Sequence, residues 1–403
     1  GTATDRTGPF GGHRVSVREE DAEAALGLPR QIICLAVGTV AVLIAGLQPL
    51  ILGGWGHEGR LSGVGIGLAA MGELFALGLA VSLAATFLKP TAMRIKIALA
   101  CLGHAAATVA GLRLTSYGLV LDRSIAGLFE GVMLWSAISM IVRSGSAERW
   151  AGVFATAQTL AQLAVAASLA AWVIPPFGVN GGLIVLTVLS IIAGLAALFG
   201  PDRMAPLHRA EKGPGGPLAS RPTAGLVAIF LSLAFIVSLW VYLDPLAQRA
   251  GLSSETAGLV VALALAAQVA GGMTATVIGP RWRAGPILIG VAALQAVALA
   301  GIGSPPSPLV FAGAVVLFGF LWMFALPLHT ALMIELDPTR RAALQIGAAQ
   351  LLGSSFGPLV AGLIVGEGAV SKVFPASAGF LALSTILFAI VQAVMSPRRT
   401  ERR

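Results

Sequence analysis

Long apolar segments, separated by short polar breaks, make up almost the whole chain. Stretches of roughly 20 apolar residues recur between positions 31 and 396, and a helix needs roughly that length to cross a bilayer. The segments lack the alternating polarity and aromatic girdles of a membrane β-barrel. Only helices and closed barrels satisfy every backbone polar group in lipid. The pattern therefore predicts an all-α integral membrane protein.

The polar breaks divide the chain into twelve expected transmembrane helices. Clusters of Gly, Pro, Ser and charged residues mark the breaks, as at 57–60, 304–308 and 337–339. The expected spans are 31–54, 63–87, 95–112, 119–142, 150–173, 179–199, 223–246, 256–278, 285–303, 308–333, 342–366 and 374–396.

The longest internal break is rich in Pro and Gly and separates two groups of six spans. We therefore expect an N-terminal tail at 1–30, a six-helix bundle at 31–199, a linker at 200–222, a second bundle at 223–396 and a tail at 397–403.

The two halves also resemble each other in sequence. Residues 148–160 align with 340–352 at an offset of 192, and Gly67 aligns with Gly258 at an offset of 191. Some transporter folds are built from such parallel repeats, related by an axis along the membrane normal. The repeat predicts two pseudo-symmetric bundles.

The composition supports a lipid environment. Only 11% of the 403 residues are charged and 57% are hydrophobic, whereas soluble domains have about 25% charged residues. The net charge of +8 suggests a nucleic-acid partner at first sight. The placement of the basic residues favours an explanation by membrane topology instead, and no nucleic-acid partner is expected.

Basic residues concentrate in the even-numbered loops, which hold 13 against 4 in the odd-numbered loops. The even-numbered loops contain Lys89, Arg94, Lys96, Arg143, Arg149, Arg203, Arg209, Lys212, Arg221, Arg281, Arg283, Arg340 and Arg341. The odd-numbered loops contain Arg60, Arg113, Arg249 and Lys372. Because Lys and Arg near span ends stay in the cytoplasm, we expect both termini on the cytoplasmic side of the cell inner membrane.

A motif on the fourth expected span identifies a known family. Residues 123–131 read Arg-Ser-Ile-Ala-Gly-Leu-Phe-Glu-Gly. Together with the two six-span halves, this resembles the fourth-helix pattern of the major facilitator superfamily. Its Glu130-Gly131 ending is similar to the version in proton-coupled organic-anion symporters. The resemblance implies a monomeric secondary transporter, with the first, fourth, seventh and tenth helices lining a central cavity. The loop at 89–96 departs from the family because it has no acidic residue, and the first span has no Arg.

Ionisable residues inside the expected spans are candidates for proton coupling, because such residues usually face a cavity. We assign this role to Glu130, Glu73 and His329. The alternative for Glu130 is a purely structural pair with Arg123, two helical turns earlier on the same face. Glu73 and His329 are alternatively packing residues. Asp122 is expected near the outer end of its span. His104 is expected to be a packing residue.

Polar and aromatic residues near the expected cavity are candidates for solute binding. They are Arg123, Gln48, Gln158, Asp244, Trp322, Gln350 and Trp240. Each also has a structural alternative. Arg123 can neutralise a neighbouring carboxylate, the residue pairs Gln48-Pro49 and Asp244-Pro245 can simply bend helix ends, and the tryptophans can pack.

We find no enzymatic motif, no P-loop and no zinc-binding His pair, so neither an enzyme nor a cofactor is expected. Cys34 and Cys101 are expected to be buried thiols. The leading hypothesis is a proton-coupled carrier of a small organic solute, such as an aromatic carboxylate. A drug/proton antiporter is the main alternative. Minor alternatives are a solute sensor that does not transport and a copper importer using His329 and Met333.

Overall fold

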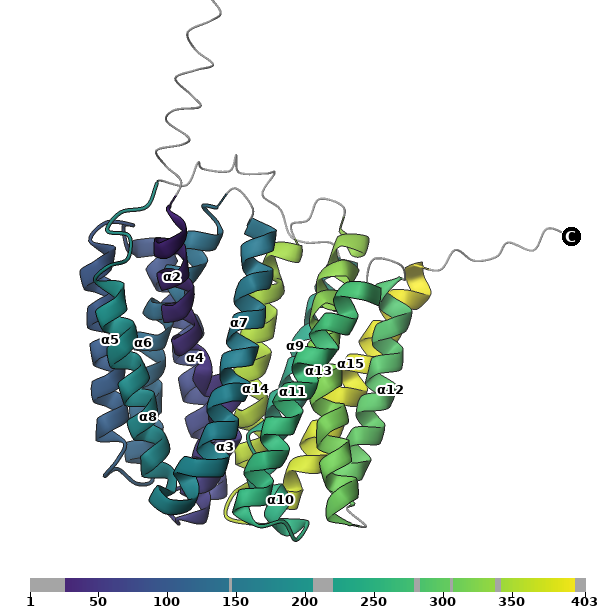
Figure 1. Ribbon diagram of the computed structural model, residues 1–403. Coiled ribbons are helices and arrows are strands. Elements are labelled where there is room, and N and C mark those ends of the chain that lie inside the picture. The colour runs from purple at the N-terminus through teal and green to yellow at the C-terminus, as the bar shows by residue number, and fades with distance from the viewer. Residues whose placement is uncertain are drawn as a thin grey trace, which may run out of the picture.

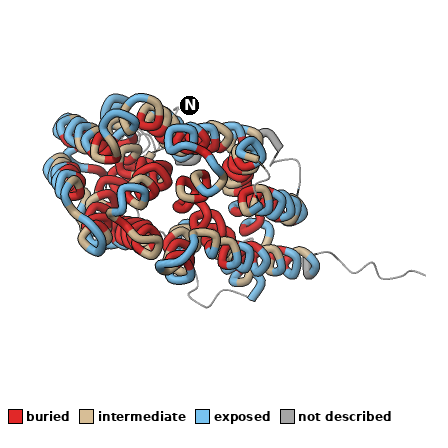
Figure 2. The backbone as a smooth tube through the Cα atoms, turned by 90° about the horizontal axis from the view of Figure 1, so that it is seen from below, coloured by how far each residue is buried: buried red, intermediate tan, exposed pale blue. Residues whose placement is uncertain are grey.

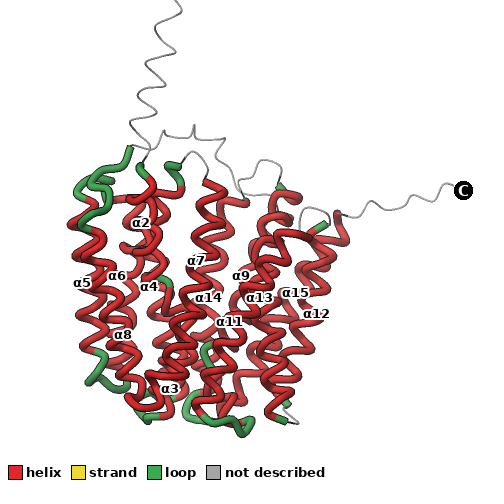
Figure 3. The backbone as a smooth tube through the Cα atoms, in the orientation of Figure 1, coloured by secondary structure: helices red, strands yellow, loops and turns green. Residues whose placement is uncertain are grey.

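The structure, a computed structural model, describes residues 26–144, 147–205, 220–278, 283–304, 307–337 and 342–395. Within these ranges the chain is almost entirely helical and no strand occurs (Figure 3), which confirms the predicted fold class. Most of the expected N-terminal tail, the expected C-terminal tail and the middle of the linker lie outside the described residues. So do several basic residues of the loop count, namely Arg209, Lys212, Arg281, Arg340 and Arg341.

The helices occupy the expected spans closely. Their bounds are α2 Leu28–Ala41, α3 Leu43–His57, α4 Gly63–Phe87, α5 Met93–Ala110, α6 Tyr117–Ile141, α7 Ala147–Ser168, η1 Leu169–Val173, α8 Ile174–Ala197, α9 Ser220–Trp240, α10 Leu243–Arg249, α11 Ser254–Ile278, α12 Ala284–Gly303, α13 Pro308–Leu336, η3 Ala343–Gln345, α14 Ile346–Val365, η4 Val370–Lys372 and α15 Val373–Met395.

Eleven helical runs within the described residues are long and apolar enough to cross a membrane. One of them, Arg149–Ala197, has 49 residues and would be about 74 Å long if straight. It breaks at Gly178, whose φ of 64° is not helical. Beyond the break, α8 continues from Val179, which packs against Gly54 of α3, and the chain then reaches Ile33 of α2 at Gly200. This run therefore makes two passes, which gives the twelve expected spans.

The first span is not one continuous helix. It breaks at Val42, whose φ and ψ are −101° and 6°. The Gln162 side chain of α7 donates from Nε2 to the Val42 carbonyl at 2.7 Å, and Gly46 leaves room for that side chain. A carbonyl freed inside a membrane protein needs such an internal partner. The kink in the first span is thus stabilised by a residue of the fifth.

Buried residues lie toward the inside of the molecule and exposed ones around its rim (Figure 2), and the buried apolar residues form three clusters. One draws on α2, α4, α5, α6 and α8, and one on α9 and α11–α15. The third and largest draws on both halves, from Leu47 and Trp55 to Trp240 and Phe318. The described chain begins and ends at the same face, at the top of Figure 1; we call it the termini face. The shared core lies toward the opposite face, so the bundles join there and have separate cores near the termini face.

Two glycine contacts related by the sequence repeat close the bundles against each other near the opposite face. A Cβ on Gly67 of α4 would lie 2.7 Å from the Cα of Gly362 on α14. A Cβ on Gly258 of α11 would lie 2.7 Å from the Cβ of Ala170 in η1. Since Gly258 is the repeat partner of Gly67, the two contacts are pseudo-symmetric. We call them together the interbundle seal.

Two hydrogen bonds reinforce the interbundle seal. The indole Nε1 of Trp240 donates to the Ala45 carbonyl at 2.9 Å. The Tyr242 hydroxyl donates to the Gly63 carbonyl at 2.7 Å. Both donors come from the second half and both acceptors from the first. The described conformation is therefore closed toward the opposite face.

We expect Gly67→Val to open the interbundle seal, because its side chain would meet Gly362 and the Tyr242 hydroxyl and overpacking costs about 1–3 kcal/mol. A reporter cysteine at Leu50, which is buried in the shared core, should then react about tenfold faster with a membrane-impermeant maleimide, since about 1.4 kcal/mol is a factor of ten. Gly290→Val is the matched control, because a Cβ at Gly290 meets nothing within 4 Å. Equal labelling of the two variants would contradict the closed seal.

Candidate functional site

A buried ionic cluster lies where α4 and α6 pack together. Arg123 is completely buried, and its Nη1 lies 3.2 Å from Glu73 Oε1. Its Nη2 and Nε donate to Asp122 Oδ2 at 2.9 and 3.2 Å. Asp122, expected near the outer end of its span, is buried and ion-paired to Arg123.

Close helix packing makes this cluster possible. Gly127 of α6 lies directly on the Glu73 carbonyl of α4, where any side chain would clash. The Trp55 ring of α3 lies near Arg123, with the guanidinium carbon 5.8 Å from the ring centroid. Trp55 is itself fully buried. The guanidinium is therefore enclosed by two carboxylates and an aromatic ring.

Glu130 has a different partner from the one that helical spacing suggests. Its Oε1 lies 3.1 Å from His104 Nε2 on α5, whereas Arg123, on the same helix face, binds Glu73 and Asp122. The other ring nitrogen of His104, Nδ1, lies 2.7 Å from the Ser190 hydroxyl of α8. That hydroxyl is also 2.8 Å from the Leu186 carbonyl. His104, expected only to pack, is thus the direct partner of Glu130.

The hydrogen bonds of the chain Ser190–His104–Glu130 can be arranged for two protonation states, while Glu130 Oε2 is buried without a partner among the described residues. With Glu130 protonated, the carboxyl donates to Nε2, Nδ1–H donates to Ser190, and Ser190 donates to Leu186. With Glu130 ionised, Nε2–H donates to the carboxylate and Ser190 donates to Nδ1. The two arrangements differ by one proton and need no movement of heavy atoms. This is the property required of a group that loads and releases protons.

The largest of the described cavities lies between the bundles. It has a volume of about 430 Å³ and is lined from α7, α11 and α13. Its lining is mostly apolar, with Val269, Met273, Met323 and Leu326 among the larger side chains. Gln268, within the eighth expected span, is the longest polar side chain of the lining and was not among the predicted residues. A search for polar residues inside apolar spans would have found it.

The predicted tryptophans form an aromatic group between α9 and α13. The rings of Trp240 and Trp322 meet edge to face, with centroids 5.4 Å apart. Phe318 extends the group from Trp322 to Phe235. Trp240 is fully buried and donates a hydrogen bond to the Ala45 carbonyl of the first half, so it is part of the interbundle seal.

The other predicted solute-binding residues are dispersed. Gln48 of α3 is completely buried, and neither of its side-chain polar atoms has a hydrogen-bond partner among the described residues. Gln158 and Gln350 are half-buried on α7 and α14, and neither belongs to the lining of the 430 Å³ cavity. Asp244 of α10 is buried near the opposite face.

His329 lies inside the second bundle. Its ring stacks on Phe388 of α15 with centroids 6.0 Å apart, and neither ring nitrogen has a partner among the described residues. Met333 instead packs against Gly225 of α9, and Met323 lines the cavity. His329 and Met333, one helical turn apart on α13, thus pack against different helices, α15 and α9.

Asp244 lies between two cavities at the opposite face. Asp244 lines a cavity of about 240 Å³. Gln248 donates a hydrogen bond from Nε2 to Asp244 Oδ2 at 2.9 Å and lines a second cavity of about 360 Å³. The expected seventh span, 223–246, is too long at its end, because α9 ends at Trp240 and α10 is a separate helix of 7 residues that is not among the membrane-spanning helices. Burial raises the pKa of Asp244 to about 6, although nearby His57 and the Gln248 hydrogen bond act to lower it.

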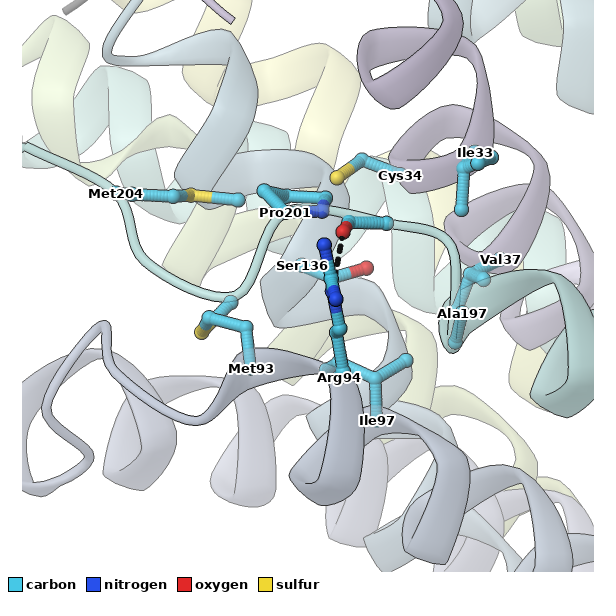
Figure 4. A pocket seen from close by; sticks show the side chains of 11 residues that line it. Ile33, Cys34, Val37, Met93, Arg94, Ile97, Ser136, Ala197, Pro201 and Met204 are labelled. Carbon is cyan, nitrogen blue, oxygen red and sulfur yellow. Dashed lines mark hydrogen bonds between the residues drawn. The ribbon is translucent and has the colours of Figure 1, made fainter.

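The unusual loop after α4 is fixed to the segment after α8 at the termini face. Arg94 Nε donates to the Gly200 carbonyl at 2.8 Å (Figure 4). Backbone hydrogen bonds join Met93 to Asp202 and Met204 to Pro90. The pocket they enclose is only about 10 Å³, about the space of one water. The loop is therefore held by backbone carbonyls in place of an acidic side chain.

The comparisons with known proteins agree with this architecture. The sequence profile described as Major Facilitator Superfamily matches residues 31–361. No curated protein matches the chain.

Solved transporter structures share the fold. A mutant of the nucleoside transporter NupG is 13% identical over 92% of this chain and 100% of that chain, with a TM-score of 0.73. A bacterial homologue of the human lysosomal transporter Spinster, inward-facing and occupied, is 15% identical over 92% of this chain and 98% of that chain, with a TM-score of 0.65. At these identities the likeness concerns the fold alone.

We expect Arg123→Met to destabilise the protein by about 3–5 kcal/mol, because it leaves the buried carboxylates of Glu73 and Asp122 without a cation. Unfolding of the purified protein in detergent measures this loss. Arg113→Met, at an exposed position, is the control and should change stability by about 0.5 kcal/mol or less. If both variants unfolded alike, the ionic cluster would have no role in stability.

We expect the interbundle seal to weaken as pH rises through about 6. The closed state, in which the pKa of Asp244 is about 6, binds the proton more tightly than an open state in which the carboxyl has its ordinary pKa. The stabilisation of the closed state relative to the open state is therefore fully present below about pH 4 and lost above about pH 6. His57 of α3 and Gln248 face Asp244, and Glu58 and Glu255 line the adjoining cavity.

Maleimide labelling of a cysteine at Leu50, normalised to one at exposed Arg113, measures this opening. The normalised rate should increase between about pH 4 and about pH 6 and level off above that. It should stay constant in Asp244→Asn. A pH dependence that survives this substitution would assign the effect to another group.

Proposed function

Because the chain belongs to the Major Facilitator Superfamily, we propose that it is a secondary active transporter, not an enzyme, which moves a small organic solute by alternating access. The described state supports this proposal. It has a shared core and a seal near the opposite face and a cavity of about 430 Å³ between the bundles. Rocking of two such bundles about a central site is the alternating-access motion of this class of fold.

The termini face is proposed to be the cytoplasmic side of a cell inner membrane. The basic residues of the even-numbered loops support this orientation. Among those described, Lys89, Arg94 and Arg143 lie in loops or helix ends at the termini face, where Arg94 and Arg143 bind backbone carbonyls. With the opposite face sealed, the described state is then inward-facing. We propose that one chain, as a monomer, forms the complete transport unit.

Proton coupling is the second part of the proposal, and the Ser190–His104–Glu130 chain is the observation that carries it. Glu130 is 1% exposed, so it must exchange its proton in a different conformation or through a transient water path. The nearby cluster contains one guanidinium and two further carboxylates, Glu73 and Asp122. Uncompensated buried charge is costly, so a proton on Glu130 or Glu73 reduces the net negative charge of the bundle. Glu73 is therefore the second proposed coupling site.

His329 remains a third candidate for proton coupling, supported only by its burial and its two unpartnered ring nitrogens. The copper hypothesis gains no support, because His329 and Met333 contact different helices. A solute sensor that does not transport would bind its ligand without exchange across the membrane.

The direction of transport has two candidates. The fourth-helix motif favours import of an organic carboxylate. However, Arg123, the residue proposed to hold it, is enclosed by Glu73, Asp122 and Trp55 and is not part of the cavity lining. The apolar lining favours the alternative, proton-driven efflux of a drug-like compound.

We expect Glu130→Gln to abolish proton-driven transport while solute exchange persists. A thermal-shift screen of organic acids and amphipathic drugs first selects a compound that stabilises the purified protein. Proteoliposomes then report its accumulation driven by a proton gradient and its counterflow without one. The side chain of glutamine does not ionise at the pH of the assay and cannot carry the coupled proton, so accumulation should fall to the background while counterflow continues.

Glu255→Gln, at an exposed position on α11, is the control and should retain accumulation. Proton-driven accumulation by Glu130→Gln would remove Glu130 from the mechanism. Ligand binding without any counterflow in the unmodified protein would instead support the sensor hypothesis.

A further inference from the structure

We infer that the cavity between α7, α11 and α13 binds an uncharged, largely apolar solute that presents a hydrogen-bond acceptor to Gln268. This inference rests on the proposed transport function and specifies the chemical class of the solute. The cavity draws Thr156 and Thr159 from the first half and Gln268, Met273 and Met323 from the second. A bound solute would therefore contact both bundles.

Gln268 has an unpartnered hydrogen-bond donor that a ligand in the cavity could satisfy. Its side chain is 3% exposed, it lines the cavity, and its Nε2 has no hydrogen-bond partner among the described residues. A buried donor without a partner costs about 1–3 kcal/mol. A carbonyl, ether or hydroxyl oxygen of a solute in the cavity would remove that cost.

The two threonines limit what else the lining can offer. The Thr156 hydroxyl donates to the Gly152 carbonyl at 3.0 Å, and the Thr159 hydroxyl donates to the Ala155 carbonyl at 2.8 Å. Their protons are used within α7, so only oxygen lone pairs face outward. Among the polar side chains of the described lining, Gln268 is thus the one with an unused donor. Its Nε2 is itself buried, so a solute reaches it once the amide turns toward the cavity.

A charged solute would find no counter-charge in this lining. None of the eleven described lining residues is ionisable. The cation deepest in the first bundle, Arg123, is engaged with Glu73 and Asp122. Moving a carboxylate or an ammonium into such a site costs several kcal/mol of desolvation that nothing offsets. The volume of about 430 Å³ is within the range of about 300–1,000 Å³ typical of small-molecule sites.

Three probes of similar shape test the charge preference. N-methyl-1-naphthamide is neutral and has a carbonyl acceptor, 1-naphthoate is an anion, and 1-naphthylmethylamine is a cation at neutral pH. Binding to the full-length protein in detergent is measured by equilibrium dialysis. We expect the amide to bind at least about tenfold more tightly than either ion, since burying an unpaired charge costs several kcal/mol. Equal or tighter binding of an ion, or no binding of the amide, would overturn the inference.

Two glutamine variants test the proposed donor. Gln268→Leu should weaken binding of the amide about three- to tenfold, the effect of one neutral hydrogen bond, and should change binding of the ions less. Gln295→Leu is the matched control, because Gln295 is equally buried with an unpartnered Nε2 but lies on α12, outside the lining. If both variants weakened binding equally, or neither did, Gln268 would not be the donor.

The failure of this inference can be distinguished from the failure of the proposed function. Counterflow of a charged compound through proteoliposomes, with weak binding of the neutral amide, would disprove the solute class and leave transport intact. Binding of the amide that depends on Gln268, without counterflow of any compound, would support the site and disprove transport.

Discussion

A buried cation in a membrane bundle must find its counter-charges within the protein, and Arg123 sets this constraint for the first half. Lipid cannot compensate the guanidinium, so Asp122 of the same helix and Glu73 of α4 surround it. Their approach requires Gly127 where α6 crosses α4. With Arg123 engaged in this way, Glu130 lies next to a different partner, His104. The ion pair thereby leaves Glu130 to a hydrogen-bonded chain with His104 and Ser190, which is the chain that we propose exchanges a proton.

The second half repeats the helix packing but not the charges. Gly319 of α13 lies against the Ala264 carbonyl of α11, as Gly127 lies against the Glu73 carbonyl. The offsets are those of the sequence repeat, and the position of Glu73 corresponds to Ala264. Aromatic rings around Trp322 occupy the second bundle instead. The fold thus preserves its backbone geometry while its halves differ in chemistry: the buried cluster of ion pairs lies in the first, and the aromatic group and Gln268, with its unpartnered Nε2, lie in the second.

The sequence predicted the spans and the repeat well because both depend on local composition. Apolar length, Gly/Pro breaks and the offset of 191–192 are visible without knowing any contact. The pairing of side chains was predicted less well. Helical periodicity relates Arg123 to Glu130, but it contains no information about α4 or α5, which supply the partners Glu73 and His104. The break at Val42 was missed for the same reason, because its hydrogen-bond partner, Gln162, is more than a hundred residues away.

The symmetry of the seal bears on how alternation can be coupled to the cavity. Gly67 and Gly362 form one contact and Gly258 and Ala170 the other, so opening toward the opposite face must separate both pairs together. The same helices, α7 with η1 on one side and α11 on the other, continue from the second contact to the cavity lined by Thr159 and Gln268. A solute that bridges α7 and α11 therefore acts on the elements that form the seal. Under the proposed function, binding biases the equilibrium between open and closed states only through its different contacts with the two, and the lining that would supply those contacts belongs to both bundles.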